Sequence, residues 1–316
     1  MPEIVSIGNI WILIGFNVFV LLMLALDLGV FHKDDHVVSV KESLVWTGVW
    51  IALALAFAGV VYYFFGYKPM MEYLAGYILE KSLSVDNIFV FIMVFSFFSV
   101  PREYQHRVLF WGILTALVLR GVFILAGAAL LSAFHWIIYV FGVVVLYTGF
   151  KMLLTKEDHK FDPGKSLIVK FTRKFFHISE KYHGHDFFVW ENGKLHATLL
   201  FMVLVIIEFV DVIFAFDSIP AIFGITKDPF IVYTSNVFAI LGLRALYFAM
   251  AGIITLFKYL GQGVALVLIF IGVKMMSEEF VHIPIVLSLG IIGSILLGSV
   301  LLSIVVARRQ TSDPKK

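Results

Sequence analysis

The chain has 316 residues, of which 61% are hydrophobic and 15% are charged, and its formal net charge is +2 at pH 7. Soluble domains are about half apolar and a quarter charged, so this composition excludes an ordinary soluble protein. The absence of cysteine excludes disulfides, zinc-thiolate sites and a cysteine nucleophile. The near-neutral charge does not favour nucleic-acid binding.

Apolar runs separated by polar stretches predict about nine transmembrane helices. Their ranges are 9–30, 44–65, 73–98, 108–131, 136–154, 197–223, 231–256, 263–280 and 285–306. As helices, these runs match a hydrocarbon thickness of about 30 Å. The first residues lack the basic segment of a cleavable signal, so we expect 9–30 to be a retained span. The predicted fold is all-α, a polytopic membrane protein with a single transmembrane domain over residues 1–316.

The connection 155–196 is the one long polar segment, rich in Lys and His, and we expect an amphipathic or irregular loop outside the membrane. Most Lys and Arg residues outside the spans fall on the side of this loop and of the C-terminus. The other side carries Lys68, Lys227 and Lys274. The positive-inside rule therefore places the loop and the C-terminus in the cytoplasm and the N-terminus outside.

The sequence contains an internal repeat. Residues 112–154 align with 236–276, which places Arg120 against Arg244 and Gly149 against Gly272. Each arginine follows a helix with two acids six residues apart. These pairs are Glu80 with Asp86, and Asp211 with Asp217.

Each repeat, 73–154 (helices 3–5) and 197–280 (helices 6–8), contains three predicted helices. Because three is odd, the repeats enter the membrane from opposite sides and form an inverted pair. Transporters are often built in this way. A duplicated scaffold that moves nothing is the alternative.

Five acidic residues fall inside predicted spans: Glu80, Asp86, Glu208, Asp211 and Asp217. Each costs about 2.5–3.5 kcal/mol at membrane depth, so the charges need compensation. The basic residues well inside spans are Lys81, Arg120 and Arg244. A divalent cation would remove the remaining deficit, and bound protons are another solution.

Helical spacing places Glu80, Ser84 and Asn87 on one stripe, and a matching stripe carries Glu208, Asp211, Ala215 and Ser218. Asp86 and Asp217 point about 120° away from these stripes. If all of them bind one ion, the helices are broken or the ion lies between several helices. Pro220 could free the carbonyl of Phe216 for this purpose, or could serve packing alone.

The ligands available in the spans are carboxylate, amide, hydroxyl and carbonyl oxygens, which suit Mn²⁺, Mg²⁺ or Ca²⁺. Arg120 and Arg244 could be structural ion-pair partners or gating residues. Asp27, near the cytoplasmic end of the first span, could be an entry ligand or a boundary residue. The histidines of the long loop could bind metal, or could belong to an ordinary solvated loop.

The acidic segments are similar to those of the TerC/Alx family of membrane proteins, and most similar to its Alx-like branch. The matching stretches are 80–89 (EKSLSVDNIF), 208–221 (EFVDVIFAFDSIPA), 234–244 (TSNVFAILGLR), 25–29 (ALDLG) and 282–284 (HIP). The resemblance implies a bacterial inner-membrane protein, with relatives linked to Mn²⁺ export, alkaline-pH response and tellurite resistance. The family's acidic motif residues fall on Glu80, Asp86, Asn87, Glu208, Asp211, Asp217 and Ser218.

Our hypothesis is a Mn²⁺ exporter working by alternating access, with metal neutralising the acids in one state and protons or arginine in the other. The alternatives are a membrane scaffold or assembly factor, in which Lys81, Arg120 and Arg244 pair with the acids, and a transporter of Ca²⁺ or a tellurium oxyanion. No nucleophile-base constellation suggests an enzyme or an organic cofactor. The expected partners are the lipid bilayer and the metal ion, with protein partners left open.

Overall fold

The computed structural model describes residues 6–29, 39–134, 136–154, 182–191, 193–251, 259–277 and 283–312, with isolated residues between 169 and 179 and at 280–281. The side chains of Asp27, Asp86 and Asp217 are outside this description. Most of the loop 155–181, including the predicted metal-binding histidines at 159 and 177, is also outside it.

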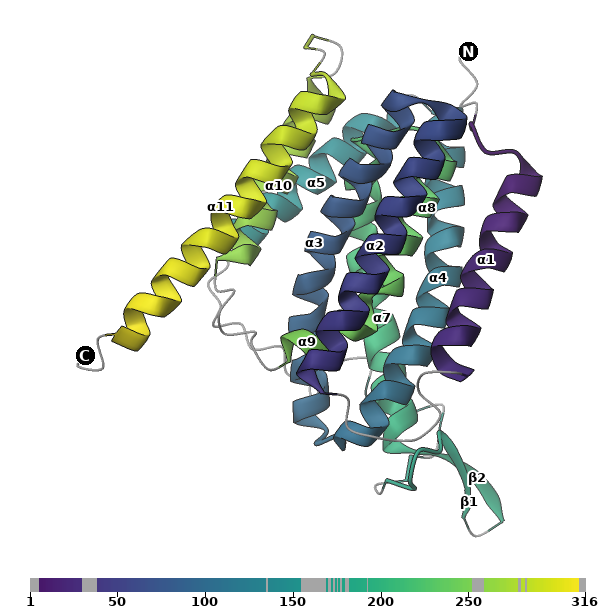
Figure 1. The fold of residues 1–316 in the computed structure, drawn as a ribbon. Helices are drawn as coiled ribbons and strands as arrows, with labels where there is room; N and C mark the ends of the chain where they lie inside the picture. Colours follow the sequence, from purple (N-terminus) through teal and green to yellow (C-terminus); the bar gives the residue numbers. More distant parts are fainter. Residues whose placement is uncertain are drawn as a thin grey trace.

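The described chain forms a bundle of helices (Figure 1). Their bounds are α1 Ile10–Gly29, α2 Val40–Phe65, α3 Tyr67–Phe97, α4 Arg102–Ala133, α5 Ile137–Leu154, α7 Leu199–Phe223, α8 Pro229–Leu241, α9 Leu243–Met250, α10 Leu260–Met276 and α11 Ile285–Ser312. Each predicted span contains one helix, except that 231–256 contains both α8 and α9. These two helices meet at Gly242 with a bend of 40°.

Five of the described helices are long and apolar enough to cross a membrane: α2, α4, α5, α7 and α11. The bent pair of α8 and α9 would make a sixth crossing. The apolar parts of α1 (Ile10–Ala25) and α10 (Leu260–Met276) are shorter. Helix α3 is long but includes Glu72, Glu80, Lys81 and Asp86. The all-α polytopic membrane fold is confirmed, whereas a total of nine crossings stays a prediction.

Polar side chains cap the N-terminal ends of α2, α7 and α8. The Ser39 hydroxyl accepts a hydrogen bond from the backbone of α2, and the Thr198 hydroxyl does the same for α7. Asp228 accepts from the backbone N–H groups of Phe230 and Ile231 and so caps α8. It also accepts from the N–H of Ile7 at 2.7 Å, which ties the N-terminal segment to the start of α8.

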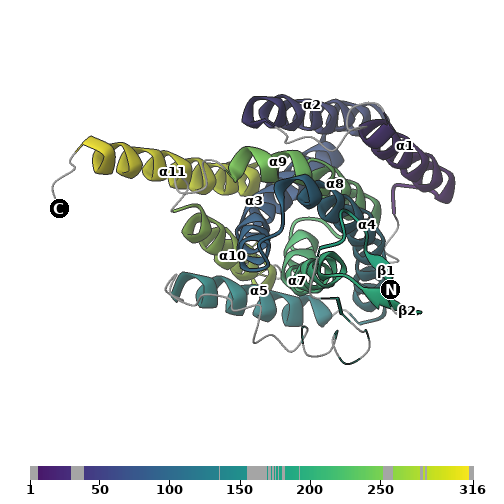
Figure 2. The same cartoon turned by 90° about the horizontal axis from the view of Figure 1, so that it is seen from below.

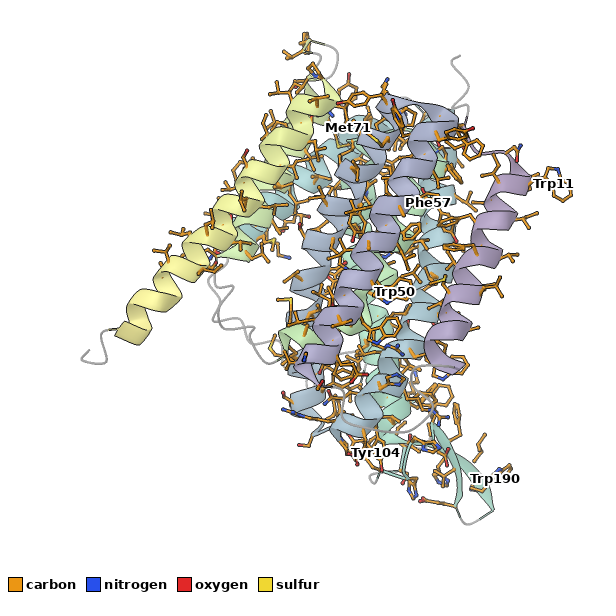
Figure 3. The ribbon with its side chains drawn as sticks, viewed as in Figure 1. Trp11, Trp50, Phe57, Met71, Tyr104 and Trp190 are labelled. Carbon is orange, nitrogen blue, oxygen red and sulfur yellow. The ribbon has the colours of Figure 1, made fainter. Side chains whose placement is uncertain are left out.

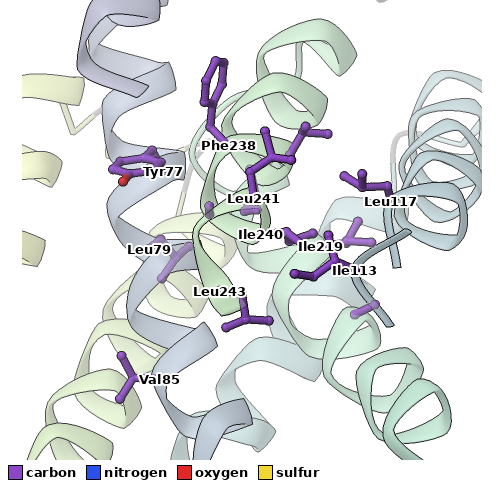
Figure 4. Packing of buried hydrophobic residues seen from close by; sticks show 14 of the residues in the cluster. Tyr77, Leu79, Val85, Ile113, Leu117, Ile219, Phe238, Ile240, Leu241 and Leu243 are labelled. Carbon is purple, nitrogen blue, oxygen red and sulfur yellow. The ribbon is translucent and has the colours of Figure 1, made fainter. Parts of the chain in front are cut away.

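Helices α3, α4, α7 and α8 pack against one another, with α1 and α2 along one side of the bundle (Figure 2). Buried apolar side chains from these helices and α9 fill the space between them, among them Leu79, Leu117, Ile219 and Phe238 (Figure 4). Large apolar side chains also cover outward faces, where Trp11 is 76% exposed (Figure 3). Such faces are those expected of helices in contact with lipid tails.

Helices α5 and α10 cross with their backbones in direct contact. A Cβ added at Gly149 would lie 3.0 Å from the carbonyl oxygen of Ala265. A Cβ added at Gly272 would lie 3.0 Å from the amide nitrogen of Leu146. Small residues permit this kind of close approach between membrane helices.

The segment predicted as an amphipathic or irregular loop contains a β-hairpin of strands β1 Phe188–Glu191 and β2 Lys194–Ala197, a regular element that was not predicted. The strands are antiparallel, with Trp190 opposite Leu195. Asn192-Gly193 between alternating apolar residues is a known hairpin signal, and Gly193 has a φ of 73°. Beside the hairpin, the Tyr182 hydroxyl donates to the Phe98 carbonyl at 2.7 Å, which joins the loop to the end of α3.

Candidate functional site

Arg120 of α4 lies at the centre of a buried polar cluster formed with α3 and α7. Its Nη1 donates to Glu80 Oε1 and to Ser218 Oγ, the latter at 3.3 Å. Its Nη2 donates to Asp211 Oδ1 at 3.3 Å. An arginine of the first predicted repeat therefore contacts one acid from each repeat.

Helical periodicity explains how these side chains reach the interior. Glu80, Ser84 and Asn87 are all buried on α3, as their predicted stripe requires. On α7, Asp211 and Ser218 are 5% and 2% exposed, and Glu208 is only partly buried. The two inward-facing stripes are thus confirmed by the structure.

The cluster carries more negative than positive charge among its described side chains. Glu80 and Asp211 share the single guanidinium of Arg120. The second oxygen of Glu80 and the hydroxyl of Ser84 are buried without a hydrogen-bond partner in the described part of the chain. Buried polar atoms are normally satisfied, so two such oxygens on one helix are unusual.

Glu208 lies one turn before Asp211 and lines a small cavity of about 10 Å³. That volume is close to the minimum that holds one water molecule. Apolar side chains of α3, α4, α7, α8 and α9 form most of the wall, and Glu208, Asp211 and Arg244 contribute its charges. Neither oxygen of Glu208 accepts a hydrogen bond of normal geometry from a described residue, although the Thr115 hydroxyl is close enough to influence the carboxylate.

Arg244 faces this cavity from α9, and its Nη1 lies 2.7 Å from His106 Nε2. His106 was not among the predicted site residues. It precedes the predicted span 108–131 by two positions, so a search for polar groups inside spans passes over it. The position of His106 near the start of α4 is the signal that could have identified it as a polar residue at the membrane boundary.

Lys81 has a hydrogen-bond partner on α8. Its Nζ donates to the Ala239 carbonyl at 3.1 Å, near the end of α8. The ion pairs recorded for the described residues do not include Lys81. Arg120, by contrast, contacts two of the predicted acids, Glu80 and Asp211.

The structure does not assemble every predicted ligand. No group of three or more His, Asp or Glu side chains placed to hold a metal ion occurs within the described residues. The side chains of Asp86, Asp217 and Asp27 lie outside the description. Helix α7 continues through Pro220 to Phe223, and the helix break lies instead at Gly242.

Comparison with known proteins identifies the family. Residues 65–311 match the model of the integral membrane protein TerC family. An uncharacterized membrane protein of Myxococcus xanthus is 48% identical, covering 99% of this chain and 98% of the relative. A Photorhabdus laumondii protein named "Putative membrane-bound redox modulator Alx" is 44% identical, covering 98% and 99% of the two chains.

The Escherichia coli K12 protein of the same name is 45% identical, covering 90% of this chain and 91% of its own length. No solved structure matches the chain. The family match covers most of the chain, and these relatives match over nearly their full lengths. The protein is a multi-pass membrane protein that belongs to the TerC family.

Proposed function

We propose that the protein exports a divalent cation, with Mn²⁺ as its substrate, through a site formed by the acidic stripes of α3 and α7. The observation that carries this proposal is the charge of the buried cluster. Glu80 and Asp211 share one arginine, and Glu208 lies one turn before Asp211 with the Thr115 hydroxyl near its carboxylate but no hydrogen bond of normal geometry from a described residue. A cation bound between these oxygens would compensate charges that are costly inside a membrane.

Arg120 has a specific role in this proposal. It occupies the position between Glu80 and Asp211 that a cation would take. Cation binding then requires the guanidinium to withdraw, and Arg120 returns when the cation leaves. Protons on the carboxylates are the other possible occupants, which would couple export to proton movement.

The packing of the helices supports an inverted repeat and alternating access. In the proposed repeat, α3 corresponds to α7, α4 to the α8–α9 pair, and α5 to α10. Helix α3 packs on α8 as α4 packs on α7, and α5 packs on its own counterpart α10. A twofold axis would convert the contact of α3 with α8 into that of α7 with α4, and would exchange α5 with α10. Two halves related in this way can rock about a site that lies between them.

The choice of Mn²⁺ rests on ligand chemistry and on the family resemblance. Carboxylate and hydroxyl oxygens suit hard divalent cations, including Mg²⁺ and Ca²⁺. A tellurium oxyanion fits less well, because Arg120 is already bound to two carboxylates. The name of the Photorhabdus and Escherichia relatives mentions redox modulation, but this chain has no cysteine for thiol chemistry.

The test is ion flux into liposomes that contain the purified protein, comparing Mn²⁺, Ca²⁺ and Mg²⁺ with and without a pH gradient. We expect Mn²⁺ flux that Glu208→Gln or Asp211→Asn, at two acids of the cluster, strongly reduces while the protein stays folded. Glu103→Gln, at an exposed acid in the first turn of α4, is the control and should transport normally. Normal flux in both of these cluster variants would exclude the site. Charge-swapped acid–arginine pairs that retain full function would favour a scaffold.

A further inference from the structure

The positively charged side chain of Lys81 lies at the break between α8 and α9. The last four carbonyls of any α-helix lack intrahelical donors and carry the negative end of the helix dipole. At the end of α8, the Ala239 carbonyl accepts a hydrogen bond from Lys81 Nζ at 3.1 Å. The ammonium of α3 therefore lies where the dipole of α8 attracts positive charge.

Gly242 provides the space for this ammonium. A Cβ added at Gly242 would lie 2.8 Å from Lys81 Nζ and 3.0 Å from the Cβ of Trp50. Any larger residue at this position would press on the lysine or on Trp50, which is itself 3% exposed. Leu241 and Leu243 lie on either side of the break in the packed interior (Figure 4).

The break and the lysine are both departures from the internal repeat. In the alignment of the two acidic helices, Val212 occupies the position of Lys81. In the alignment of the two arginine-containing segments, Val118 occupies the position of Gly242, and α4 runs through it without interruption. These two differences between the predicted repeats lie next to each other in the structure.

We propose that this break is a monovalent-cation site in which the Lys81 ammonium replaces a free ion such as Na⁺ or K⁺. Broken membrane helices commonly use their free carbonyls and C-terminal ends to coordinate such ions. Here the cation is covalently attached to α3, so the site is permanently filled. The inference concerns a position outside the acidic cluster and does not depend on Mn²⁺ transport.

The proposal predicts that removing the ammonium makes the protein require a free cation. Thermal unfolding of purified Lys81→Met would be measured in NaCl, KCl and choline chloride at equal ionic strength. We expect the unfolding temperature to rise by about 5 °C, in a saturable way, when Na⁺ or K⁺ replaces choline. The unsubstituted protein should show no such difference, and Lys81→Arg, which keeps a cation, should resemble it.

Lys68→Met is the matched control, because Lys68 lies on the same helix with a side chain that is 79% exposed. An unfolding temperature of Lys81→Met that is the same in all three salts would overturn the proposal. So would failure of that variant to fold in every salt, since a free ion is expected to substitute for the ammonium. A response of equal size in Lys68→Met would assign the effect to general salt stabilisation and would also overturn it.

Discussion

Gly149 and Gly272 make reciprocal contacts across the crossing of α5 and α10. Gly149 approaches Ala265 and Ile269, which precede Gly272 by seven and three residues. Gly272 approaches Gly142 and Leu146, which precede Gly149 by the same two spacings. Reciprocal contacts of this kind are produced by a twofold relationship between the two partners.

A methyl group at either glycine should destabilise the protein. In Gly149→Ala or Gly272→Ala, the new Cβ would lie about 3 Å from backbone atoms of the facing helix, so the crossing must open. We expect each change to cost about 1–3 kcal/mol, with similar values at the two sites. Thermal unfolding in detergent measures this, with Gly290→Ala as control, because a Cβ there would meet nothing within 4 Å. Unequal losses would argue against equivalent roles.

Replacing Arg120 should be among the most damaging single changes in the bundle. Arg120→Met leaves Glu80 and Asp211 buried without their shared partner, and we expect a loss of about 3–5 kcal/mol. Adding Glu80→Gln removes one of the two charges and should restore part of the stability. A double-mutant cycle based on unfolding temperatures measures the coupling. Arg107→Met is the control, because that guanidinium lies 5.2 Å from the Phe187 ring and its loss should cost about 1 kcal/mol at most.

Neutralising Glu208 should have the opposite effect on stability. Its carboxylate has no described hydrogen-bond partner of normal geometry, so Glu208→Gln removes a buried charge without breaking a pair. We expect unchanged stability or a gain of up to about 3 kcal/mol, together with reduced Mn²⁺ flux. Unfolding and flux are measured on the same preparation. A clear loss of stability would mean that Glu208 has a fixed partner and is not available to a cation.

Burial raises the pKa of the Tyr182 phenol from 10.0 to about 12. The neutral phenol, which donates to the Phe98 carbonyl, is therefore favoured in the folded protein. Its contribution is fully present below pH 10 and is lost as the pH rises through about 12. Tyr182→Phe should cost about 1 kcal/mol at neutral pH and should remove this component of the alkaline unfolding profile.

Unfolding of the two proteins between pH 9 and pH 12.5 checks this prediction. Tyr63→Phe, at a residue that is 81% exposed, is the control. Unfolding profiles that coincide for the parent and Tyr182→Phe at every pH would show that the contact adds nothing to stability.

The helix positions were predicted well because apolar runs of this length match the thickness of a membrane only when they form helices. The sequence also predicted which faces of α3 and α7 turn inward, since helical spacing fixes that property locally. The hairpin was not predicted, although Asn192-Gly193 is a hairpin signal, because polar and charged residues dominate the segment 155–196 and its apolar alternation covers only a few positions.

Contacts between distant segments explain the other differences. The break at Gly242 lies in an apolar stretch where an isolated glycine is often tolerated within a helix, and the lysine beside it comes from α3. Pro220 suggested a break in α7, but the helix continues past it for three residues. The contact of Arg120 with Asp211 joins the two repeats, a pairing that spacing within one helix cannot reveal.

In the proposed transporter, Arg120 has a further consequence for the movement of the two predicted repeats. Its guanidinium binds Glu80 of α3 and Asp211 of α7 at the same time, so it would hold the two repeats together whenever no cation or proton neutralises these carboxylates. A carrier locked in this way could not return empty and would resist slippage, the wasteful cycling without cargo. Each half-cycle would then require an occupant, as in an obligatory exchanger.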